Sequence, residues 1–141
     1  MYKDILGINK RNLFYLLKPD QRKKYALVDN KLITRNILIS NNISIPYLYT
    51  TFQSYIELKS LKEKISFLPS FVIKPAQGFC AHGIIILEKK QENLWEDISG
   101  KFWNLQDIKL HISSIISGMF SLSNQKDIAL IEKKNKTTFY F

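Results

Sequence analysis

The chain has 141 residues, of which 45% are hydrophobic and 23% are charged, and its formal net charge is +9. This length and composition are typical of one globular domain with a buried core and exclude an intrinsically disordered chain. No stretch approaches the roughly 18 apolar residues that span a bilayer, and the amino terminus lacks a cleavable leader. We therefore expect a cytoplasmic protein without a membrane span. The positive charge favours an anionic partner such as a nucleotide, nucleic acid or acidic lipid.

Two helices are expected in the first third of the chain. The first begins at Asn9, a residue type that caps helices, and ends at Pro19. Its apolar side consists of Leu13, Phe14, Leu16 and Leu17. The second is expected to begin after Asp29 and to end at the asparagine pair 41–42. Lys31 would then lie in the first turn, where the helix dipole disfavours a positive charge unless an anion or Asp29 lies nearby.

Two further helices are predicted from apolar residues at helical spacing. One follows a strand expected at 47–52, and its apolar side consists of Leu58, Leu61, Ile65 and Leu68. The other begins at Asn104, which resembles a capping box with Asp107, and ends near Gly118. Its apolar stripe consists of Ile108, Ile112, Ile115, Ile116, Met119 and Phe120. We expect this stripe to face the core rather than a cofactor.

Short apolar runs in the second half of the chain predict strands. The runs 71–74 and 83–87 flank a loop, residues 88–92 form a polar turn, and 94–98 is a third strand candidate. These segments read as an antiparallel meander. A short buried strand is expected at 128–131. The sequence therefore predicts an α/β (α+β) fold, with a small mixed or antiparallel sheet packed against helices.

Common catalytic motifs are absent. The sequence contains no GxxxxGK[ST], GxGxxG or GxSxG motif. Cys80 is the single cysteine, so an internal disulfide is excluded, a zinc cluster has too few ligands, and a reducing compartment fits. Cys80 and His82 lie too near in sequence to face each other as nucleophile and base. We expect His111, on the polar shoulder of its helix, to be a surface or capping group.

One lysine stands out because it interrupts an apolar run. Lys74 ends the strand 71–74 and directly precedes a loop in which Gly78 and Gly83 let the backbone approach a ligand. This arrangement is typical of an anion site. A lysine on an edge strand can also serve only to prevent aggregation, and the residues alone leave both interpretations open.

Five segments in order and spacing resemble a known family. They are ILGINKRNL (5–13), LVDNKLITRNI (27–37), ISIPYLY (43–49), FVIKPAQG (71–78) and HISSIISGMFSLSNQKDIALIE (111–132). Together they resemble the alpha-L-glutamate ligase-related, or sugar-transfer-associated, branch of the ATP-grasp superfamily. In that superfamily a nucleotide lies between two α+β lobes. The ligases use ATP to convert a carboxylate to an acyl phosphate, which an amine then attacks.

The resemblance implies which residues hold the phosphates of ATP. Lys31 and Lys74 match the two family lysines that neutralise phosphate oxygens, whose charge would otherwise be costly in a closed cleft. The loop from Gln77 to Gly83, which includes Gly78, matches the flexible flap over those phosphates.

The resemblance also implies an adenine site. The strand that ends at Glu132, with its exit, matches the hinge where adenine docks. Glu132 and Lys133 are expected to contact the base through backbone and side-chain atoms, and Ile73 and Ile131 to flank it.

Two departures from the family pattern carry consequences. The flap has Phe79-Cys80-Ala81-His82 where the family has small residues and glycines, so its amides are less free to wrap phosphate. The family's second lobe, with the acidic and amide ligands of magnesium, has no counterpart before Phe141. We therefore expect a truncated ATP-grasp region, with a pre-ATP-grasp-like segment at 1–50 and a nucleotide-binding lobe at 51–141, that is inactive alone.

The carboxylates of this chain do not match the family's metal site. Glu88, Glu92, Glu96 and Asp97 lie close in sequence, and we interpret them as a solvated turn with no metal ligand among them.

Two alternatives remain beside nucleotide binding. The chain could be a non-catalytic basic module for nucleic acid or a partner protein, in which Tyr47, Tyr49, Phe52 and Tyr55 stack on single-stranded bases. It could also assemble with a separately encoded second lobe or with itself, because halving a two-lobed protein exposes an apolar wall.

Overall fold

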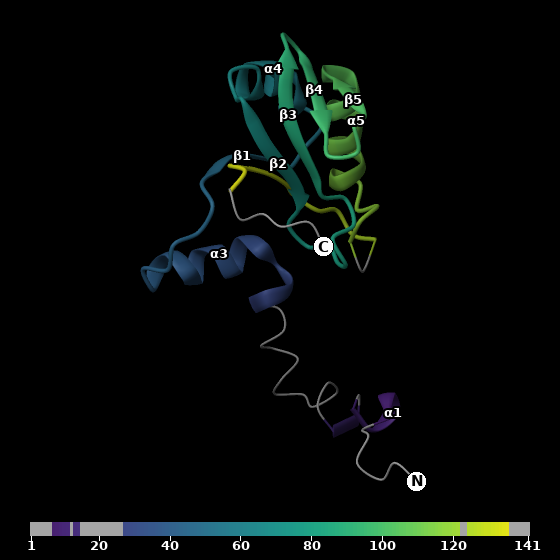
Figure 1. The fold of residues 1–141 in the computed structure, drawn as a ribbon. Coiled ribbons are helices and arrows are strands. Elements are labelled where there is room, and N and C mark those ends of the chain that lie inside the picture. Colours follow the sequence, from purple (N-terminus) through teal and green to yellow (C-terminus); the bar gives the residue numbers. More distant parts are fainter. Residues whose placement is uncertain (1–6, 12, 15–26, 122–123, 136–141) are drawn as a thin grey trace.

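A computed structural model describes residues 7–11, 13–14, 27–121 and 124–135, and its centre is one sheet (Figure 1). The strands are β1 (Leu48–Phe52), β2 (Ser70–Pro75), β3 (Ile85–Gln91), β4 (Leu94–Asp97), β5 (Phe102–Asn104) and β6 (Ala129–Glu132). Their order in the sheet is β1-β6-β2-β3-β4-β5, and every pair is antiparallel. The predicted α/β fold with a small antiparallel sheet is confirmed.

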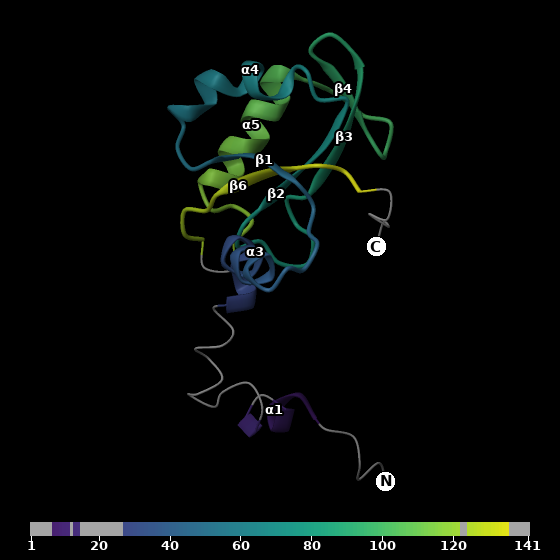
Figure 2. The same ribbon diagram turned by 90° about the vertical axis from the view of Figure 1, so that its left-hand side faces the viewer.

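The helices of the described residues differ in how they lie relative to this sheet. They are α1 (Ile8–Arg11), α3 (Lys31–Ser40), the 3-10 helix η2 (Glu57–Ser60), α4 (Leu61–Ile65) and α5 (Leu105–Ile116). Figure 2 shows α4 and α5 on the same face of the strands, whereas α3 lies at the opposite end of the sheet from α4. The core therefore lies between the sheet and the helices α4 and α5. The helix α3 does not cover the core and lies instead beside the ends of β2 and β6.

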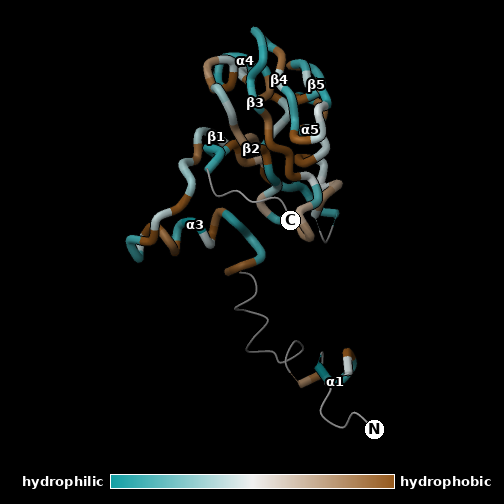
Figure 3. The backbone as a smooth tube through the Cα atoms, viewed as in Figure 1, coloured by the Kyte–Doolittle hydropathy of each residue, from teal (hydrophilic) through white to brown (hydrophobic). Residues whose placement is uncertain are grey.

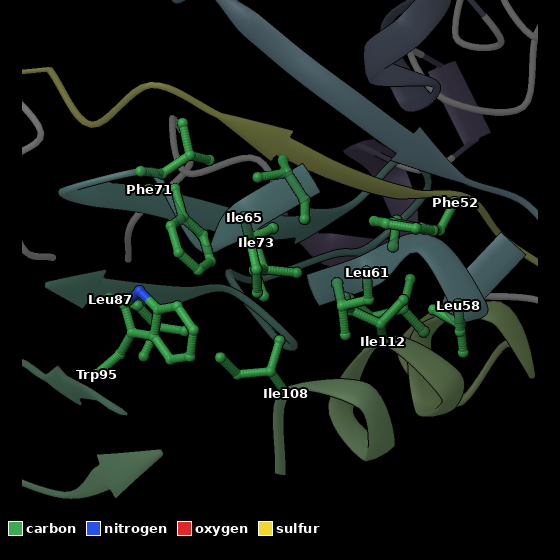
Figure 4. Packing of buried hydrophobic residues seen from close by; sticks show 14 of the residues in the cluster. Phe52, Leu58, Leu61, Ile65, Phe71, Ile73, Leu87, Trp95, Ile108 and Ile112 are labelled. Carbon is green, nitrogen blue, oxygen red and sulfur yellow. The ribbon is translucent and has the colours of Figure 1, made fainter. Parts of the chain in front are cut away.

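The core forms where the sheet meets α4 and α5. Its members are buried apolar side chains, and the largest fully buried ones include Trp95, Phe52, Phe71, Leu61, Ile65, Ile73, Leu87, Ile108, Ile112, Ile115 and Ile116. Figure 4 shows Ile108 and Ile112 of α5 beneath the strands, with Phe71 near Trp95. The centroids of these two rings are 6.0 Å apart at an interplanar angle of 71°, the edge-to-face arrangement that aromatic pairs prefer. Leu58, Leu61, Ile65 and Leu68 of the first predicted apolar side, and Ile108, Ile112, Ile115 and Ile116 of the second, are confirmed as core. The second stripe does not extend as far as predicted, because α5 ends at Ile116, Met119 is 65% exposed and Phe120 is only partly buried.

Side chains alternate between the two faces of β2 and β6. Ile73 and Ile131 are paired in register, are fully buried and belong to the core cluster. Because successive strand residues point to opposite faces, Lys74 and Glu132 point away from the core. The expectation that Ile73 and Ile131 flank a nucleotide base is therefore wrong, since both pack under α4 and α5.

Two expected helix starts differ from the structure. Asn9 lies inside α1 and so is not the residue before its first turn; Leu16, Leu17 and Pro19 fall outside the described residues. The cap of α3 is Asn30 and not Asp29, because the Asn30 Oδ1 accepts the Leu32 and Ile33 amides at 2.9 and 3.4 Å.

The polar turn expected at 88–92 is mostly strand. The strand β3 continues to Gln91, where its polar side chains pair with β4; Lys90 Nζ, for example, lies 2.7 Å from Glu96 Oε2. Figure 3 shows this change along β3, which is hydrophobic at its Ile85 end and hydrophilic toward Gln91. The prediction of a turn rested only on the polarity of these residues, which instead belong to the solvent-exposed end of a strand.

His111 anchors the loop that joins β2 to β3. Its Nε2 lies 2.9 Å from the carbonyl oxygen of Gly83, and its ring packs between Trp103 and Phe120. His111 is partly buried, which fits the predicted polar shoulder of its helix, and its ring contacts the aromatic side chains of Trp103 and Phe120. Burial, together with the charge of Lys101, lowers the pKa of His111 although the Gly83 carbonyl favours the protonated form.

The capping box of α5 gives a stability prediction. Asn104 Oδ1 accepts the Gln106 and Asp107 amides at 2.8 and 3.0 Å, and Asp107 accepts the Asn104 amide. Asn104→Ala should lower the free energy of unfolding by about 1 kcal/mol, since two helix donors lose their acceptor. Urea denaturation measures this loss. Asn104→Ser, which retains a capping oxygen, should stay close to the parent; equal losses in both variants would contradict the role of the cap.

The lowered pKa of His111 predicts a pH dependence. Below its ordinary pKa of 6.5 the unfolded chain takes up a proton at this position more readily than the folded chain does. The stability contribution of His111 is therefore present above pH 6.5 and is lost as the pH falls through the folded pKa. Urea midpoints measured from neutral to mildly acidic pH should fall more steeply for the parent than for His111→Gln. Identical slopes would count against this assignment.

Candidate functional site

The first turn of α3 is attached to the loop that follows β2. The Lys31 amide donates to the Ala76 carbonyl at 2.9 Å, and Lys31 Nζ donates to the Gly78 carbonyl at 3.0 Å. Because Asn30 caps α3, Lys31 is the first residue of the helix and points toward the end of β2. These bonds bring a residue from the first third of the chain next to Lys74.

A pocket of about 210 Å³ lies between α3 and the ends of β2 and β6. Its charged wall consists of Lys31, Arg35, Lys74 and Glu132. Its remaining wall, mostly apolar, consists of Val28, Thr34, Leu38, Ile45 and Pro46. The pocket therefore combines charged groups with an apolar surface, as small-molecule sites do.

The charges in this pocket do not balance. Lys74 Nζ lies 2.6 Å from Glu132 Oε2, and Arg35 Nη1 lies 3.4 Å from Glu132 Oε1. The Glu132 side chain is only 6% exposed, so it is a buried carboxylate shared by two cations. Three cationic groups face one carboxylate in the pocket wall, and this excess of positive charge favours a bound anion.

Lys31 is electrostatically disfavoured in this position. Burial and the nearby Lys74 lower its pKa, and Asp127 and Glu132 only partly oppose this effect. Two ammonium groups in one half-buried pocket repel each other. An anion bound between them would remove that repulsion and favour the charged form of Lys31.

The loop after β2 is held at its beginning. The Gln77 amide donates to both Asp127 oxygens at 3.1 and 3.0 Å, and Gly78 forms an isolated bridge with Ser121. Gly83, at the other end, has φ of +78°, and a Cβ there would lie 2.6 Å from Phe120 Cγ. Both ends of the loop are thus fixed by residues from outside it.

The middle of the loop contains two residues in a conformation that favours glycine. Cys80 and Ala81 have φ of +47° and +59°, each with a cost of about 1–2 kcal/mol for a residue with a Cβ. The ring of Phe79 packs against His82 with centroids 5.1 Å apart and is 37% exposed. The bulky ring therefore lies along the loop and does not enter the core.

The structure brings together three of the seven residues expected at the site. Lys31, Lys74 and Glu132 line one pocket, and the Gly78 carbonyl holds Lys31. Gln77, Gly83 and Lys133 do not line it: Gln77 and Gly83 belong to the loop anchors, and the Lys133 amide donates to the Tyr47 carbonyl at 2.8 Å.

Two charged residues of this region were not predicted from the sequence. Arg35 lies four residues after Lys31, a spacing that places both on one face of a helix, so its position could have been inferred. Asp127 lies in a polar run before β6 and is only 3% exposed in the structure. No local pattern distinguishes it from the neighbouring surface residues.

The row of aromatic residues proposed for base stacking does not form. Phe52 is fully buried in the core and Tyr49 packs against it, whereas Tyr47 and Tyr55 are exposed. The interpretation of all four as a stacking surface is wrong, because Phe52 is fully buried in the core, although the rings of Tyr47 and Tyr49 contact each other at a centroid distance of 5.4 Å.

The described parts of the chain contain no group of three or more His, Cys, Asp or Glu side chains arranged to hold a metal ion. Within the same residues, no helix has the length and apolar character needed to cross a membrane.

Comparison with known proteins identifies a family. No curated protein and no solved structure matches the chain. The model of the family described as sugar-transfer associated ATP-grasp matches residues 10–138, which include α3, the whole sheet and every residue of the pocket. The chain therefore belongs to the sugar-transfer associated ATP-grasp family.

Proposed function

We propose that the pocket between α3 and the ends of β2 and β6 binds the phosphates of ATP, in a protein related to the carboxylate-amine (alpha-L-glutamate) ligases. The observation that carries this proposal is the convergence of Lys31 and Lys74 on one pocket whose wall has more cationic than anionic groups. A triphosphate supplies negative charge and acceptor oxygens, which complement the excess of cationic donors in this pocket wall.

Both lysines can bind phosphate without losing their present partners. An ammonium group has three donors. Lys31 uses one of them for the Gly78 carbonyl, and Lys74 uses one for Glu132. The remaining donors are available to phosphate oxygens, so the observed contacts orient the two groups for a ligand and do not block them.

The adenine is proposed to lie beside the exit of β6. Glu132 is an acceptor at the pocket wall, and the chain leaves the sheet there at Lys133. Leu38, Ile45 and Pro46 supply apolar surface next to these groups. A planar base with amino donors is suited to a wall that combines a carboxylate with apolar side chains.

The size of the pocket supports a site completed by another lobe. Its volume of about 210 Å³ lies below the roughly 300–1,000 Å³ of typical ligand pockets. The remaining surface of ATP, and the ligands of its magnesium ions, would come from the second lobe that the family resemblance implies. On this proposal the chain binds nucleotide, and ligation requires the other lobe.

Replacement of the two lysines tests the phosphate site. Lys31→Met with Lys74→Met should weaken the binding of magnesium-ATP at least tenfold, since each charge-assisted hydrogen bond contributes about 1.5–3 kcal/mol. Isothermal titration calorimetry on the full chain measures the change. Methionine retains most of each apolar stem, and circular dichroism checks that the variant is folded.

The matched control is Lys62→Met with Lys109→Met, two exposed helical lysines that do not line the pocket. This variant has the same net charge as the test variant and should bind magnesium-ATP as the parent does. Equal losses in both variants would indicate a non-specific charge effect, and equal heats in parent and test variant would contradict nucleotide binding at this site.

A further inference from the structure

Asp127 is a buried carboxylate that the phosphate proposal does not use. It directly precedes Ile128 and β6 and is only 3% exposed. Among the described residues, no lysine or arginine forms an ion pair with it. A buried carboxylate is costly unless hydrogen bonds compensate its charge, so its partners indicate its role.

Backbone amides supply that compensation. The Gln77 amide lies 3.1 Å from Asp127 Oδ1 and 3.0 Å from Oδ2, and the Ile128 amide donates to Oδ1 at 2.7 Å. The Ala76 amide donates to the Ile128 carbonyl at 2.9 Å. Asp127 thus attaches the first residues after β2 to the segment before β6.

The residues that Asp127 holds are the ones that hold Lys31. The Ala76 carbonyl accepts the Lys31 amide, and the Gly78 carbonyl accepts Lys31 Nζ. Gln77 lies between these two acceptors in the chain. A shift of the Gln77 backbone would therefore displace the carbonyl that orients the ammonium group of Lys31.

We propose that Asp127 is a positioning residue of the nucleotide site, which fixes residues 76–78 so that the Lys31 ammonium group stays beside Lys74. Asp127 does not line the pocket and contacts no ligand in this proposal. The proposal rests on the proposed function only in assigning the Lys31 ammonium group to a phosphate.

The electrostatics of Lys31 support the geometry. The charge of Asp127 raises the pKa of Lys31, in opposition to burial and to Lys74; Glu132 acts in the same direction as Asp127. The other charged group of the pocket wall is Arg35. The charge of Asp127 therefore favours the charged form of Lys31, in addition to the orientation that the hydrogen bonds of residues 76–78 provide.

Asp127→Asn in the full chain tests both effects. Asparagine has nearly the same shape but no charge, and its amide nitrogen cannot accept the Gln77 amide. The Lys31 pKa, followed by carbon-13 NMR of the lysine ε-carbon and assigned with Lys31→Arg, should fall below its value in the parent. The dissociation constant for magnesium-ATP, measured by calorimetry, should rise at least tenfold.

The matched control is Asp97→Asn. Asp97 also accepts two backbone amides, from Ser99 and Lys101, but lies outside the pocket. This variant should change neither the Lys31 pKa nor ATP binding. An unchanged Lys31 pKa and unchanged affinity in folded Asp127→Asn would overturn the proposal.

Two further outcomes are decisive. If Asp127→Asn does not fold, Asp127→Glu retains the charge and moves the carboxylate by one methylene. Unchanged ATP affinity and Lys31 pKa in that variant would overturn the positioning role, and a change in either would support it. If the parent does not bind ATP, the proposed function fails, and the Lys31 pKa in Asp127→Glu, which retains the charge and moves it, still decides whether Asp127 positions Lys31.

Discussion

The strand β6 lies between β1 and β2, and its pairing with β2 determines where the charges of the site lie. Lys74 is opposite Leu130, and Val72 is opposite Glu132, so the lysine and the glutamate share the face of the sheet that α4 and α5 do not cover. The same register places Ile73 and Ile131 on the core face. A register shift by one residue would exchange the two faces and would bury Lys74 among apolar side chains. The core and the site therefore depend on the same backbone hydrogen bonds.

The site keeps an electrostatic arrangement that is unfavourable for the fold alone. Lys31, Arg35 and Lys74 face a single carboxylate in a half-buried pocket, and burial with the neighbouring cation lowers the pKa of Lys31. Functional sites commonly retain such perturbed groups because their ligand supplies the missing charge. In this chain the unfavourable charges lie on the side of the sheet opposite the core, so the core packs without them.

The loop between β2 and β3 has two fixed ends and an exposed middle. Asp127 holds the Gln77 amide at one end, and His111 holds the Gly83 carbonyl at the other. Between them, Cys80 and Ala81 adopt positive φ angles without the freedom of glycine. The anchors come from the segment before β6 and from α5, so the loop conformation depends on the packing of the whole domain. The backbone conformation of the bulky loop residues is therefore determined by contacts with the segment before β6 and with α5.

The sequence by itself determined the element types, most of the core and the two lysines. Apolar residues at helical spacing located α5, and the capping residue Asn104 located its start. Lys74 stood out as a charge within an apolar run, and the family resemblance added Lys31. Only the tertiary structure decided that Lys31 and Lys74 line one pocket, that Arg35 shares Glu132 with Lys74, that Asp127 is buried, and that His111 contacts Gly83. The errors at Ile73 and in the 88–92 turn share one cause. Local patterns report the preference of a residue for solvent or apolar surroundings, whereas strand pairing decides which surroundings it receives. The error at Asp29 is different, because two adjacent residues can both cap a helix and the side chain of Asn30 accepts the first amides of α3.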